Sequence, residues 1–479
     1  MMMTRALLSP GTGRRMALLV LVLLAGSPAS PAGFEVGVAR VKITPPTPFW
    51  MSGYASRTHP STGVLQDIWA KALAVRDPKG NRVVFVTTDL IGISRVIAVN
   101  VAAQARERFG LGRSELLLNA SHTHSGPMIW RNLPILLQLD AEDKTAVEDY
   151  GARLTESLLE VVGDALGDLS PARLSAGHGA VGFGVNRRLL TPEGYRIRVN
   201  PDGPVDHDVP VLKITAPDGT LRAVLFGYAC HNTTLGGDMD RINGDYAGWA
   251  QAELERAHPG ATALFLMLCG GDQNPNPRGT VDLAQEHGRA LATEVSRLLN
   301  ASLSPVRPPV RTAFEETRLD FATHTREVFE EEAAHDDPYR QRRARLMLAG
   351  YDDGRPVRDT PYPVHAVRFN EDLTLLALGG EVVVDYALRT KREFPEENLI
   401  VAGYSHDVMC YIPSLRVLRE GGYEAVDSMI YYGQPGPFAE SVEEKIFDAI
   451  RRVLRGVGAS ARGPMGLRPG RAAHATPAR

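Results

Sequence analysis

Short apolar runs that end in His, Asp, Asn or Glu, with glycine close by, are the most constraining feature of this sequence. Their length and near-continuous hydrophobicity are typical of β-strands buried on both faces. The runs are Arg82–Leu90, Glu115–Ala120, Leu221–Ala229, Thr262–Cys269 and Leu373–Leu378. Longer segments with helical spacing alternate with them: Arg95–Phe109, Asp143–Leu166, Tyr246–Ala257, Val281–Leu299 and Val382–Phe394. This alternation predicts an α/β fold.

Residues 33–455 are predicted to form one domain. They contain no low-complexity stretch, no linker and no internal repeat. With 479 residues, 44% of them hydrophobic, the chain is long enough to bury a large core. We expect a single large domain with a mixed β-sheet core and flanking helices. The Arg- and Glu-rich stretch from Thr325 to Met347 is expected to be one solvated helix on its surface.

Both ends of the chain differ in composition from this domain. Residues 1–32 contain three Arg residues, then an apolar run from Met16 to Ala25, then small residues. This order is typical of a secretory signal peptide. The apolar run is shorter than a membrane-spanning helix, which needs about 20 residues. We expect secretion or export to the periplasm; a retained membrane anchor is the alternative. Residues 456–479, rich in Gly, Ala, Pro and Arg, are predicted to be a disordered basic tail.

The charge of the predicted domain argues against a nucleic-acid partner. The chain has 53 basic and 56 acidic side chains, a formal net charge of −3. Seven of the basic residues and none of the acidic ones lie in the two terminal segments, so the domain itself carries about −10. Binding to nucleic-acid phosphates needs a basic face. A small-molecule or lipid substrate and peripheral contact with a membrane stay open, and nothing in the sequence indicates an oligomeric state.

Three cysteines, Cys230, Cys269 and Cys410, are too few for a disulfide framework. Each lies within one or two residues of a segment with candidate site residues. We expect them to be small buried apolar side chains beside the site. A redox or metal-binding role is the alternative.

The first polar strand ending is Asn119–Pro127 (NASHTHSGP), directly after the predicted strand Glu115–Ala120. In an extended segment, His122 and His124 would point to the same face. Imidazole is a good ligand for zinc and neighbouring transition metals. Either both histidines bind one metal ion, or one binds while the other acts beside it. A purely structural pair is the alternative.

Three further endings supply polar side chains. His231 follows the third run, the segment CGGDQNPN with Asp272 and Asn274 ends the fourth, and Glu381 follows two glycines after the fifth. Each has a plainer explanation: a structural histidine, a turn, or a carboxylate that offsets the dipole of a helix it opens. Ligand sites in α/β sheets form at the carboxyl ends of strands. We therefore expect these endings to meet in one site.

A site built from these endings has the side chains of a catalytic metal centre. Two histidines and a carboxylate, with one position left for water, form a common zinc site in hydrolases. Because the residues are far apart in the sequence, a local zinc finger is excluded. The sequence predicts a zinc-dependent hydrolase with its metal at the C-terminal ends of strands, although such sites also accept manganese or iron.

These segments resemble the neutral/alkaline, non-lysosomal ceramidase family. The NASHTHSGP block is the most specific element. The other matching elements are Gly37–Thr44 (GVARVKIT), Met51–Tyr54 (MSGY), Asn186-Arg187, His231, the GDxxPN block, Glu381 and the Tyr-rich region from Tyr411 to Tyr432. The resemblance covers the chain up to about residue 455. It implies a large α/β catalytic domain, and we expect no C-terminal immunoglobulin-like domain such as longer members have.

The resemblance also implies roles for individual residues. The implied zinc ligands are His122, His231, Glu381 and Tyr411. His124 and Arg187 would lie close to the metal and contact the reacting group, and Tyr423 would stabilise the developing oxyanion. Zinc lowers the pKa of a bound water towards neutrality and polarises an amide carbonyl. A single oxyanion donor contributes about 3–4 kcal/mol to catalysis.

Two segments depart from the family pattern. In the family block Gly-Asp-x-Ser-Pro-Asn, the serine has been proposed as a nucleophile or essential site residue, and here Asn274 stands in its place. An amide does not replace a hydroxyl nucleophile, so attack by zinc-activated water is favoured over an acyl-serine route. Asp272 of the same block is kept as a candidate catalytic residue. The segment from His231 to Asp245 also differs, and both departures bear on whether ceramide is the substrate.

Three functions are compatible with these residues. The first is a zinc amidohydrolase that uses zinc-activated water on an N-acyl bond, with ceramide or a related lipid as substrate. The second is a zinc hydrolase of the same fold for a non-lipid amide or an ester. The third is an exported, non-catalytic metal-binding protein. The presence of all the implied ligands favours an enzyme.

Overall fold

The computed structural model describes residues 33–460. The predicted signal peptide and residues 461–479 of the predicted tail lie outside these residues. The last helix, α9 (Val442–Gly456), is followed by the buried side chains of Val457 and Ala459. The packed structure therefore continues a few residues past the predicted start of the tail at residue 456. Within residues 33–460, no helix is both long and apolar enough to cross a bilayer.

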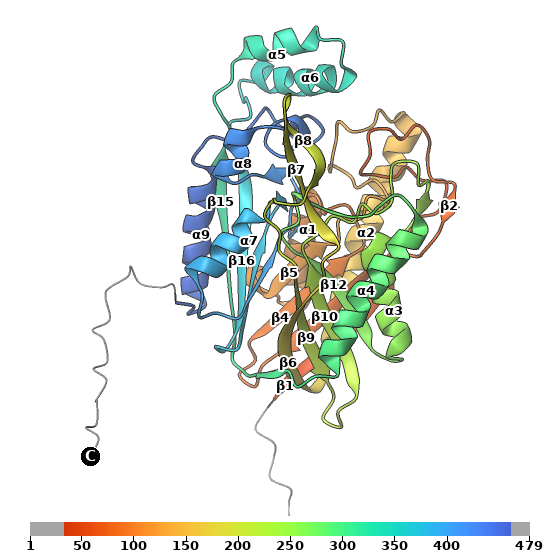
Figure 1. The fold of residues 1–479 in the computed structure, drawn as a ribbon, viewed down its shortest axis with the longest axis vertical. Helices are drawn as coiled ribbons and strands as arrows, with labels where there is room; N and C mark the ends of the chain where they lie inside the picture. Colours follow the sequence, from red (N-terminus) through yellow and green to blue (C-terminus); the bar gives the residue numbers. More distant parts are fainter. Residues whose placement is uncertain (1–32, 461–479) are drawn as a thin grey trace, which may run out of the picture. The chain divides into compact units, whose positions relative to one another are not determined.

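The larger of two central β-sheets is mixed (Figure 1). Its strands are β1 (Phe34–Lys42), β3 (Trp69–Arg76), β4 (Arg82–Thr88), β5 (Leu116–Ala120), β6 (Ser170–Ala180), β9 (Asp208–Thr215), β10 (Leu221–Tyr228), β12 (Thr262–Met267) and β14 (Ser304–Val306). They lie in the order β12-β10-β9-β6-β1-β3-β4-β5, and β14 also pairs with β6. The β4–β5 and β10–β12 pairs are parallel and the other pairs are antiparallel.

A second sheet packs face to face against the first. Its strands, in spatial order, are β15 (Val310–Asp320), β16 (Asp359–Phe369), β17 (Leu373–Leu378) and β19 (Leu399–Ala402). The ring of Phe369 lies between the sheets, 5.9 Å from the ring of Phe34 and 6.5 Å from that of Phe85. Alternate side chains of each strand point into this interface or to the opposite face, as the two-residue repeat of a strand requires.

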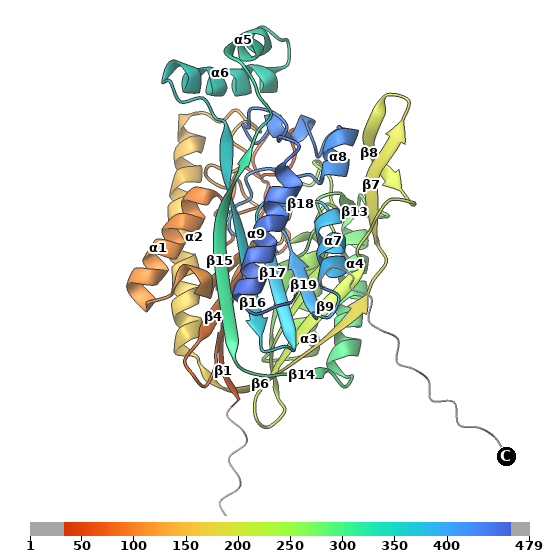
Figure 2. The same ribbon diagram turned by 90° about the vertical axis from the view of Figure 1, so that its left-hand side faces the viewer.

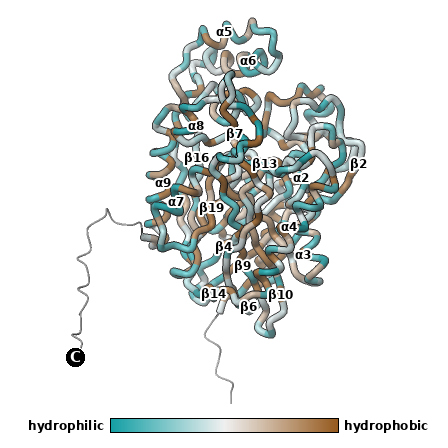
Figure 3. Tube along the Cα trace, viewed as in Figure 1, coloured by the Kyte–Doolittle hydropathy of each residue, from teal (hydrophilic) through white to brown (hydrophobic). Residues whose placement is uncertain are grey.

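Helices cover the outer faces of both sheets, which gives four layers (Figures 1 and 2). On the larger sheet these are α1 (Arg95–Phe109), α2 (Ala141–Gly167), α3 (Asp245–Ala257) and α4 (Val281–Leu299). On the smaller sheet they are α7 (Asp385–Glu393) and α9. Hydrophobic residues gather along the central strands (Figure 3). The predicted α/β class, with a mixed sheet and flanking helices, is confirmed.

Short elements extend from these layers. They are β2 (Gly63–Val64), β7 (Gly184–Thr191), β8 (Gly194–Asn200), β11 (Arg241–Ile242), β13 (Gln273–Pro275), β18 (Glu381–Val382), β20 (Tyr411–Ile412), α5 (Arg326–Ala333), α6 (Pro338–Asp352), α8 (Leu415–Glu420), and the 3-10 helices η1 (Arg113–Glu115) and η2 (Asp427–Ile430). The single helix predicted from Thr325 to Met347 is two helices, because Asp337 caps a new helix that begins with a proline.

One predicted helix starts later than expected. The segment Val382–Phe394 is helical only from Asp385, because Glu381 and Val382 pair in parallel with Tyr411 and Ile412. Glu381 therefore does not open a helix, and its carboxylate is not explained by compensation of a helix dipole.

The carboxyl ends of strands from both sheets meet around Asn119, the penultimate residue of β5. Its side-chain nitrogen donates to the carbonyl of Gly403, 2.8 Å away, and its side-chain oxygen accepts from the backbone N–H of Met267, 2.9 Å away. Asn119 also forms a backbone bridge with Ser405. This junction brings the predicted polar strand endings close to one another.

Candidate metal and active site

His122 follows β5 in a left-handed backbone conformation, with φ of +64°. Its N–H donates to the carbonyl of Leu90, and its ring Nδ1 lies 2.5 Å from the carbonyl oxygen of Ile91. Since a carbonyl only accepts, Nδ1 carries a proton, which leaves Nε2 as the ring nitrogen that can bind a metal ion. That Nε2 lies 3.0 Å from Oε2 of Glu381. The ring is thus held in the tautomer that a metal ligand needs.

His231 is held in the same way after β10. Its Nδ1 donates to the carbonyl of Gly270 at 2.8 Å. Its Nε2 lies 3.1 Å from Oε2 of Glu381 and 3.1 Å from the hydroxyl of Tyr411. Burial, with the charge of Arg187 next, lowers the pKa of His231 to about 3. The imidazole is therefore neutral, as a ligand must be.

Glu381 and Tyr411 are direct neighbours on the paired strands β18 and β20. The Glu381 side chain is buried, and its Oε2 faces ring nitrogens of both His122 and His231. The turn before Asp272 fits only a glycine at 271, because a Cβ there would lie 2.7 Å from the carbonyl oxygen of Glu381. This close approach explains the second glycine of the pair.

The donor set fits a divalent metal. Nε2 of His122 and Nε2 of His231 lie 3.0 and 3.1 Å from Oε2 of Glu381. Ligand atoms of a tetrahedral zinc site are about 3.4 Å apart, given metal–ligand distances near 2.1 Å. The ring nitrogens of His122, His124 and His231 also lie within 4.8 Å of one another. The described chain thus holds a three-histidine group that can bind a metal ion.

His124 lies beside this group. Its Nδ1 is 3.0 Å from the carbonyl oxygen of Gly53, and its Nε2 is 3.0 Å from Nε2 of His122. Burial lowers the pKa of His124 well below its usual value. Gly53 has φ of +93°, and a Cβ there would lie 2.7 Å from the His124 ring, which accounts for the glycine of the MSGY segment.

The prediction that His122 and His124 meet because they lie two apart in an extended segment is wrong. The segment is not extended, so the two rings do not meet by the alternation of a strand. The positive φ of His122 turns the chain, and the two rings meet edge to face with centroids 4.7 Å apart.

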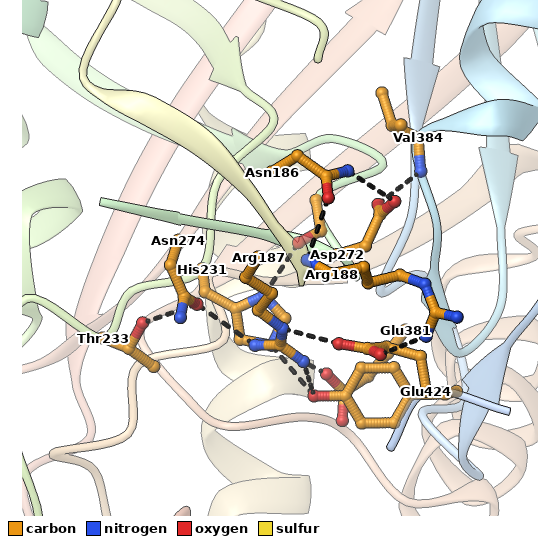
Figure 4. Close-up of polar contacts among 12 residues, drawn as sticks. Asn186, Arg187, Arg188, His231, Thr233, Asp272, Asn274, Glu381, Val384 and Glu424 are labelled. Carbon is orange, nitrogen blue, oxygen red and sulfur yellow. Dashed lines mark hydrogen bonds and ion pairs between the residues drawn. The ribbon is translucent and has the colours of Figure 1, made fainter. Parts of the chain in front are cut away.

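Arg187 connects the predicted ligands to the rest of the site (Figure 4). Its guanidinium donates from Nη2 to the Tyr411 hydroxyl at 2.8 Å, from Nη1 to Oδ1 of Asn274 at 3.1 Å, and from Nε to Glu424 at 2.8 Å. It also lies over the ring of Tyr423, 5.8 Å from its centroid. Arg187, Asn274, Tyr411 and Tyr423 therefore form one connected group.

Glu424 was not identified from the sequence. Its carboxylate is buried between the guanidinium groups of Arg187 and Arg188, which donate to it at 2.8 and 2.6 Å. Burial alone would raise its pKa, but the two guanidinium groups hold the pKa below its usual value. Its one sequence signal is its position next to Tyr423.

Asp272 is placed differently from the other predicted catalytic residues. One carboxylate oxygen accepts from the backbone N–H of Val384 at 2.8 Å and the other from the Asn186 amide at 3.2 Å. Its backbone carbonyl accepts from the N–H of Arg187. Burial raises its pKa to about 7. Its contacts are with the segments that carry Arg187 and Glu381, so the structure gives it a positioning role.

A cavity of about 340 Å³ opens above these residues. Its polar lining includes His122, His124, Arg187, Thr233, Asn274, Glu381, Tyr411 and Tyr423. Its apolar lining includes Ala55, Ile91, Leu133, Leu136 and Ile197. A polar floor with apolar walls suits an amphipathic molecule with a polar reacting group.

The three cysteines are buried free thiols, consistent with small apolar side chains.

The fold and these side chains define an α/β protein with a histidine-rich candidate metal centre at the floor of a cavity. The family model described as neutral/alkaline non-lysosomal ceramidase, N-terminal, matches residues 34–307. The chain belongs to this family. The matched residues include His122, His124, Arg187, His231, Asp272 and Asn274. Glu381, Tyr411 and Tyr423 lie beyond them, and the fold brings these three to the same cavity.

Individual relatives are similar over about half of this chain. Neutral ceramidase A of Dictyostelium discoideum is 26% identical over 269 residues, which are 52% of this chain and 37% of that protein. Neutral ceramidase of Drosophila pseudoobscura pseudoobscura is 26% identical over 282 residues, 55% of this chain and 39% of that protein. The matches span about two fifths of these relatives. A crystal structure of neutral ceramidase from Pseudomonas aeruginosa has the same fold, with a TM-score of 0.69 at 19% identity over 91% of this chain and 77% of that chain.

Proposed function

We propose that this protein is a zinc-dependent amidohydrolase that cleaves the N-acyl bond of ceramide or a related lipid. The observation that carries the proposal is the meeting of His122, His231, Glu381 and Tyr411, of which all but His231 line a partly apolar cavity. The family of the chain supports the same reaction class. We also propose that the protein acts after export, on the basis of residues 1–32.

The four predicted ligands suit zinc better than a harder cation. Two imidazoles, a carboxylate and a phenol are donors that zinc accepts, and magnesium or calcium prefer sites made of oxygen atoms. When bound, zinc supplies an acidified water and polarises the substrate carbonyl.

The remaining side chains orient the substrate and the attacking water. Arg187 carries a permanent positive charge at the cavity, which favours negative charge that develops on a carbonyl oxygen. Tyr423 is a neutral phenol there, because burial raises its pKa. His124 is a neutral imidazole whose Nδ1 donates to Gly53. Its Nε2 lies beside the predicted metal ligand His122 and can orient the attacking water by accepting a hydrogen bond from it.

The apolar wall of the cavity supports an acyl or alkyl chain near the reacting bond. Leu133, Leu136 and Ile197 line the cavity together with the polar floor. A hydrocarbon chain packed there removes apolar surface from water, worth about 25 cal/mol per Å². A charged soluble substrate would gain nothing from this wall.

The experiment is hydrolysis of a panel of N-acyl lipids, soluble amides and esters by zinc-loaded protein. We expect release of fatty acid from at least one N-acyl lipid. His231→Ala should lose both zinc, measured by elemental analysis, and turnover. His178→Ala is the matched control, because His178 lies in a surface ion pair with Asp208. Zinc-loaded protein that hydrolyses nothing in the panel would overturn the proposal.

A second candidate is a zinc hydrolase for a soluble amide or ester. The observation that favours it is the polar lining, in which Arg278 joins the expected site residues. Faster hydrolysis of a soluble substrate than of every lipid in the same panel would favour this candidate.

A further inference from the structure

The hairpin of β7 and β8 carries an apolar strip that the described residues leave exposed. Leu190 is 64% exposed, Val199 49% and Ile197 45%. In the register of the hairpin, Leu190 is paired with Tyr195, and Arg188 with Ile197. Directly paired side chains share a face, and so do residues two apart in one strand. The three apolar side chains therefore form one strip along a single face of the hairpin.

This strip continues into the apolar wall of the cavity. Ile197 lines the cavity together with Leu133 and Leu136. The hairpin extends beyond the packed layers, at the same end of the molecule as α8 and the α5–α6 pair (Figures 1 and 2). Single exposed apolar side chains are common on soluble proteins, whereas a contiguous strip that leads into a cavity marks an interaction surface.

The other face of the hairpin carries two exposed cations. Arg196 and Arg198 alternate along β8 with the residues of the strip, so they lie on the opposite face. Within residues 33–460, neither forms an ion pair shorter than 4 Å, and the Arg196 guanidinium donates only to the carbonyl of Tyr195. Glu193, in the turn between the strands, accepts a hydrogen bond from the hydroxyl of Thr191 instead. Both guanidinium groups are therefore available to an anionic partner.

A negatively charged lipid surface fits both faces of this hairpin. Apolar side chains enter the boundary between headgroups and acyl chains, and long arginine side chains reach the headgroup phosphates from either face of a two-stranded element. The domain as a whole has a negative net charge and is repelled by such a surface. Free cations beside the cavity therefore determine which end of the molecule approaches the lipid.

A second copy of this chain fits the hairpin less well. β8 is the edge strand of the sheet β13-β7-β8, and an exposed edge strand can pair with another copy. Two copies paired through β8 would bring Arg196 and Arg198 of one close to those of the other. Like charges on paired strands are destabilising. The arginines thus oppose self-pairing and favour an anionic surface.

We propose that the β7–β8 hairpin is a membrane-docking element, which binds anionic lipid bilayers through Leu190, Val199, Arg196 and Arg198. The use of this docking, entry of a lipid into the cavity past Ile197, rests on the proposed function. A lipid that leaves the bilayer along the strip keeps its hydrocarbon chain against apolar side chains. Its transfer then avoids much of the cost of exposing that chain to water.

The test is cosedimentation with vesicles of phosphatidylcholine alone and of phosphatidylcholine mixed with phosphatidylglycerol, without substrate. We expect wild-type protein to bind the mixed vesicles more tightly, and less so at high salt. Arg196→Gln/Arg198→Gln should weaken this binding about 25-fold, about five-fold or 1 kcal/mol per arginine. Leu190→Ser/Val199→Ser should weaken it about 10-fold or more, because less apolar area enters the bilayer.

Matched controls lie on α1 and α4. Arg106→Gln/Arg289→Gln removes two exposed arginines that also form no ion pair within residues 33–460. Val99→Ser removes an apolar side chain that is 52% exposed. Both controls should bind vesicles as the wild type does. No binding by wild-type protein, or hairpin variants that bind as tightly as the controls, overturns the inference.

Two further outcomes distinguish the alternatives. Sedimentation velocity that shows a dimer dissociated by the hairpin variants, without vesicle binding, would assign the hairpin to self-association and overturn the inference. Hydrolysis of N-acyl lipids in detergent by protein that ignores vesicles overturns the inference alone. Vesicle binding that depends on the hairpin, without hydrolysis of any substrate, supports docking and overturns the proposed function alone.

Discussion

The hydroxyl of Tyr432 donates a hydrogen bond to Oε1 of Glu381, and the other carboxylate oxygen of Glu381 faces the two histidine nitrogens. The Tyr432 ring is almost fully buried and lies near the ring of Tyr411. The hydrogen bond fixes the rotation of the carboxylate, so that Oε2 points at the predicted metal position. Partners of this kind orient ligands and are part of the metal site.

We expect Tyr432→Phe to lower zinc affinity about 10- to 100-fold, the usual cost of losing such a partner. The phenyl ring keeps the packing, so the fold should stay intact. Competition with a chromophoric chelator measures the affinity. Tyr431→Phe is the control, because Tyr431 lines the same cavity and packs against Tyr339. Unchanged affinity in Tyr432→Phe would mean that the pairing of β18 with β20 orients Glu381 without help.

Arg57 connects the segment that carries His124 to the loop that carries Met239. Its guanidinium donates to the carbonyl of His124 at 2.9 Å and to that of Met239 at 2.6 Å, and it lies over the Tyr54 ring. Within residues 33–460 it forms no ion pair shorter than 4 Å, so its buried charge is satisfied by carbonyl groups.

Arg57→Leu should therefore release the segment that carries His124. Misplacement of a reacting group by about 1 Å costs up to about 100-fold in rate. We expect kcat to fall by up to about 100-fold while zinc content stays as in the wild type. Turnover and elemental analysis of the same samples measure both. Arg40→Leu, at a surface ion pair, controls for loss of an arginine. Loss of zinc in step with activity would contradict a role confined to His124.

The strand endings could be identified from the sequence because their signals are local. Apolar runs and the polar residues that follow them lie within a few positions, so β5 with His122 and β10 with His231 follow from the pattern alone. Glu424 and Arg57 could not be found in this way. Each acts through a contact with a segment distant in sequence, such as Glu424 with Arg187, and a lone charged residue in a loop has no periodicity.

The junction between the two sheets depends on Asn119. Asn119→Ala removes the bonds to Gly403 and Met267 and leaves the buried N–H of Met267 without this partner, while the Gly403 carbonyl keeps the hydroxyl of Ser405. Such an orphaned group costs about 1–3 kcal/mol. We expect the free energy of unfolding, measured in urea, to fall by about 1–3 kcal/mol. Asn100→Ala, on the exposed face of α1, is the control. A change as small as that of the control would show that β5 and β12 hold their ends together without this side chain.

His365 and His406 form a buried pair away from the cavity. Nε2 of His365 donates to the carbonyl of Ser114 at 2.8 Å, so its Nδ1 accepts from Nε2 of His406 at 3.1 Å. Burial, with the charge of Arg113 next, lowers the pKa of His365 to about 3. The ring of Phe314 lies against both imidazoles and under the Arg113 guanidinium. Burial and the charge of Arg113 therefore outweigh the hydrogen bond to Ser114, which alone would raise the pKa of His365.

This pair makes the folded state sensitive to acid. The unfolded chain binds a proton at His365 below its ordinary pKa of 6.5, and the folded state does not bind it until about pH 3. The free energy of unfolding therefore falls as the pH drops through this window, by up to about 1.4 kcal/mol per pH unit for this group. We expect His365→Gln to reduce the slope between pH 5.5 and 4.5 by about this amount in urea titrations. His59→Gln, on the exposed surface, controls for the substitution. A slope equal to that of the wild type would mean that His365 takes up its proton in the folded and unfolded states alike.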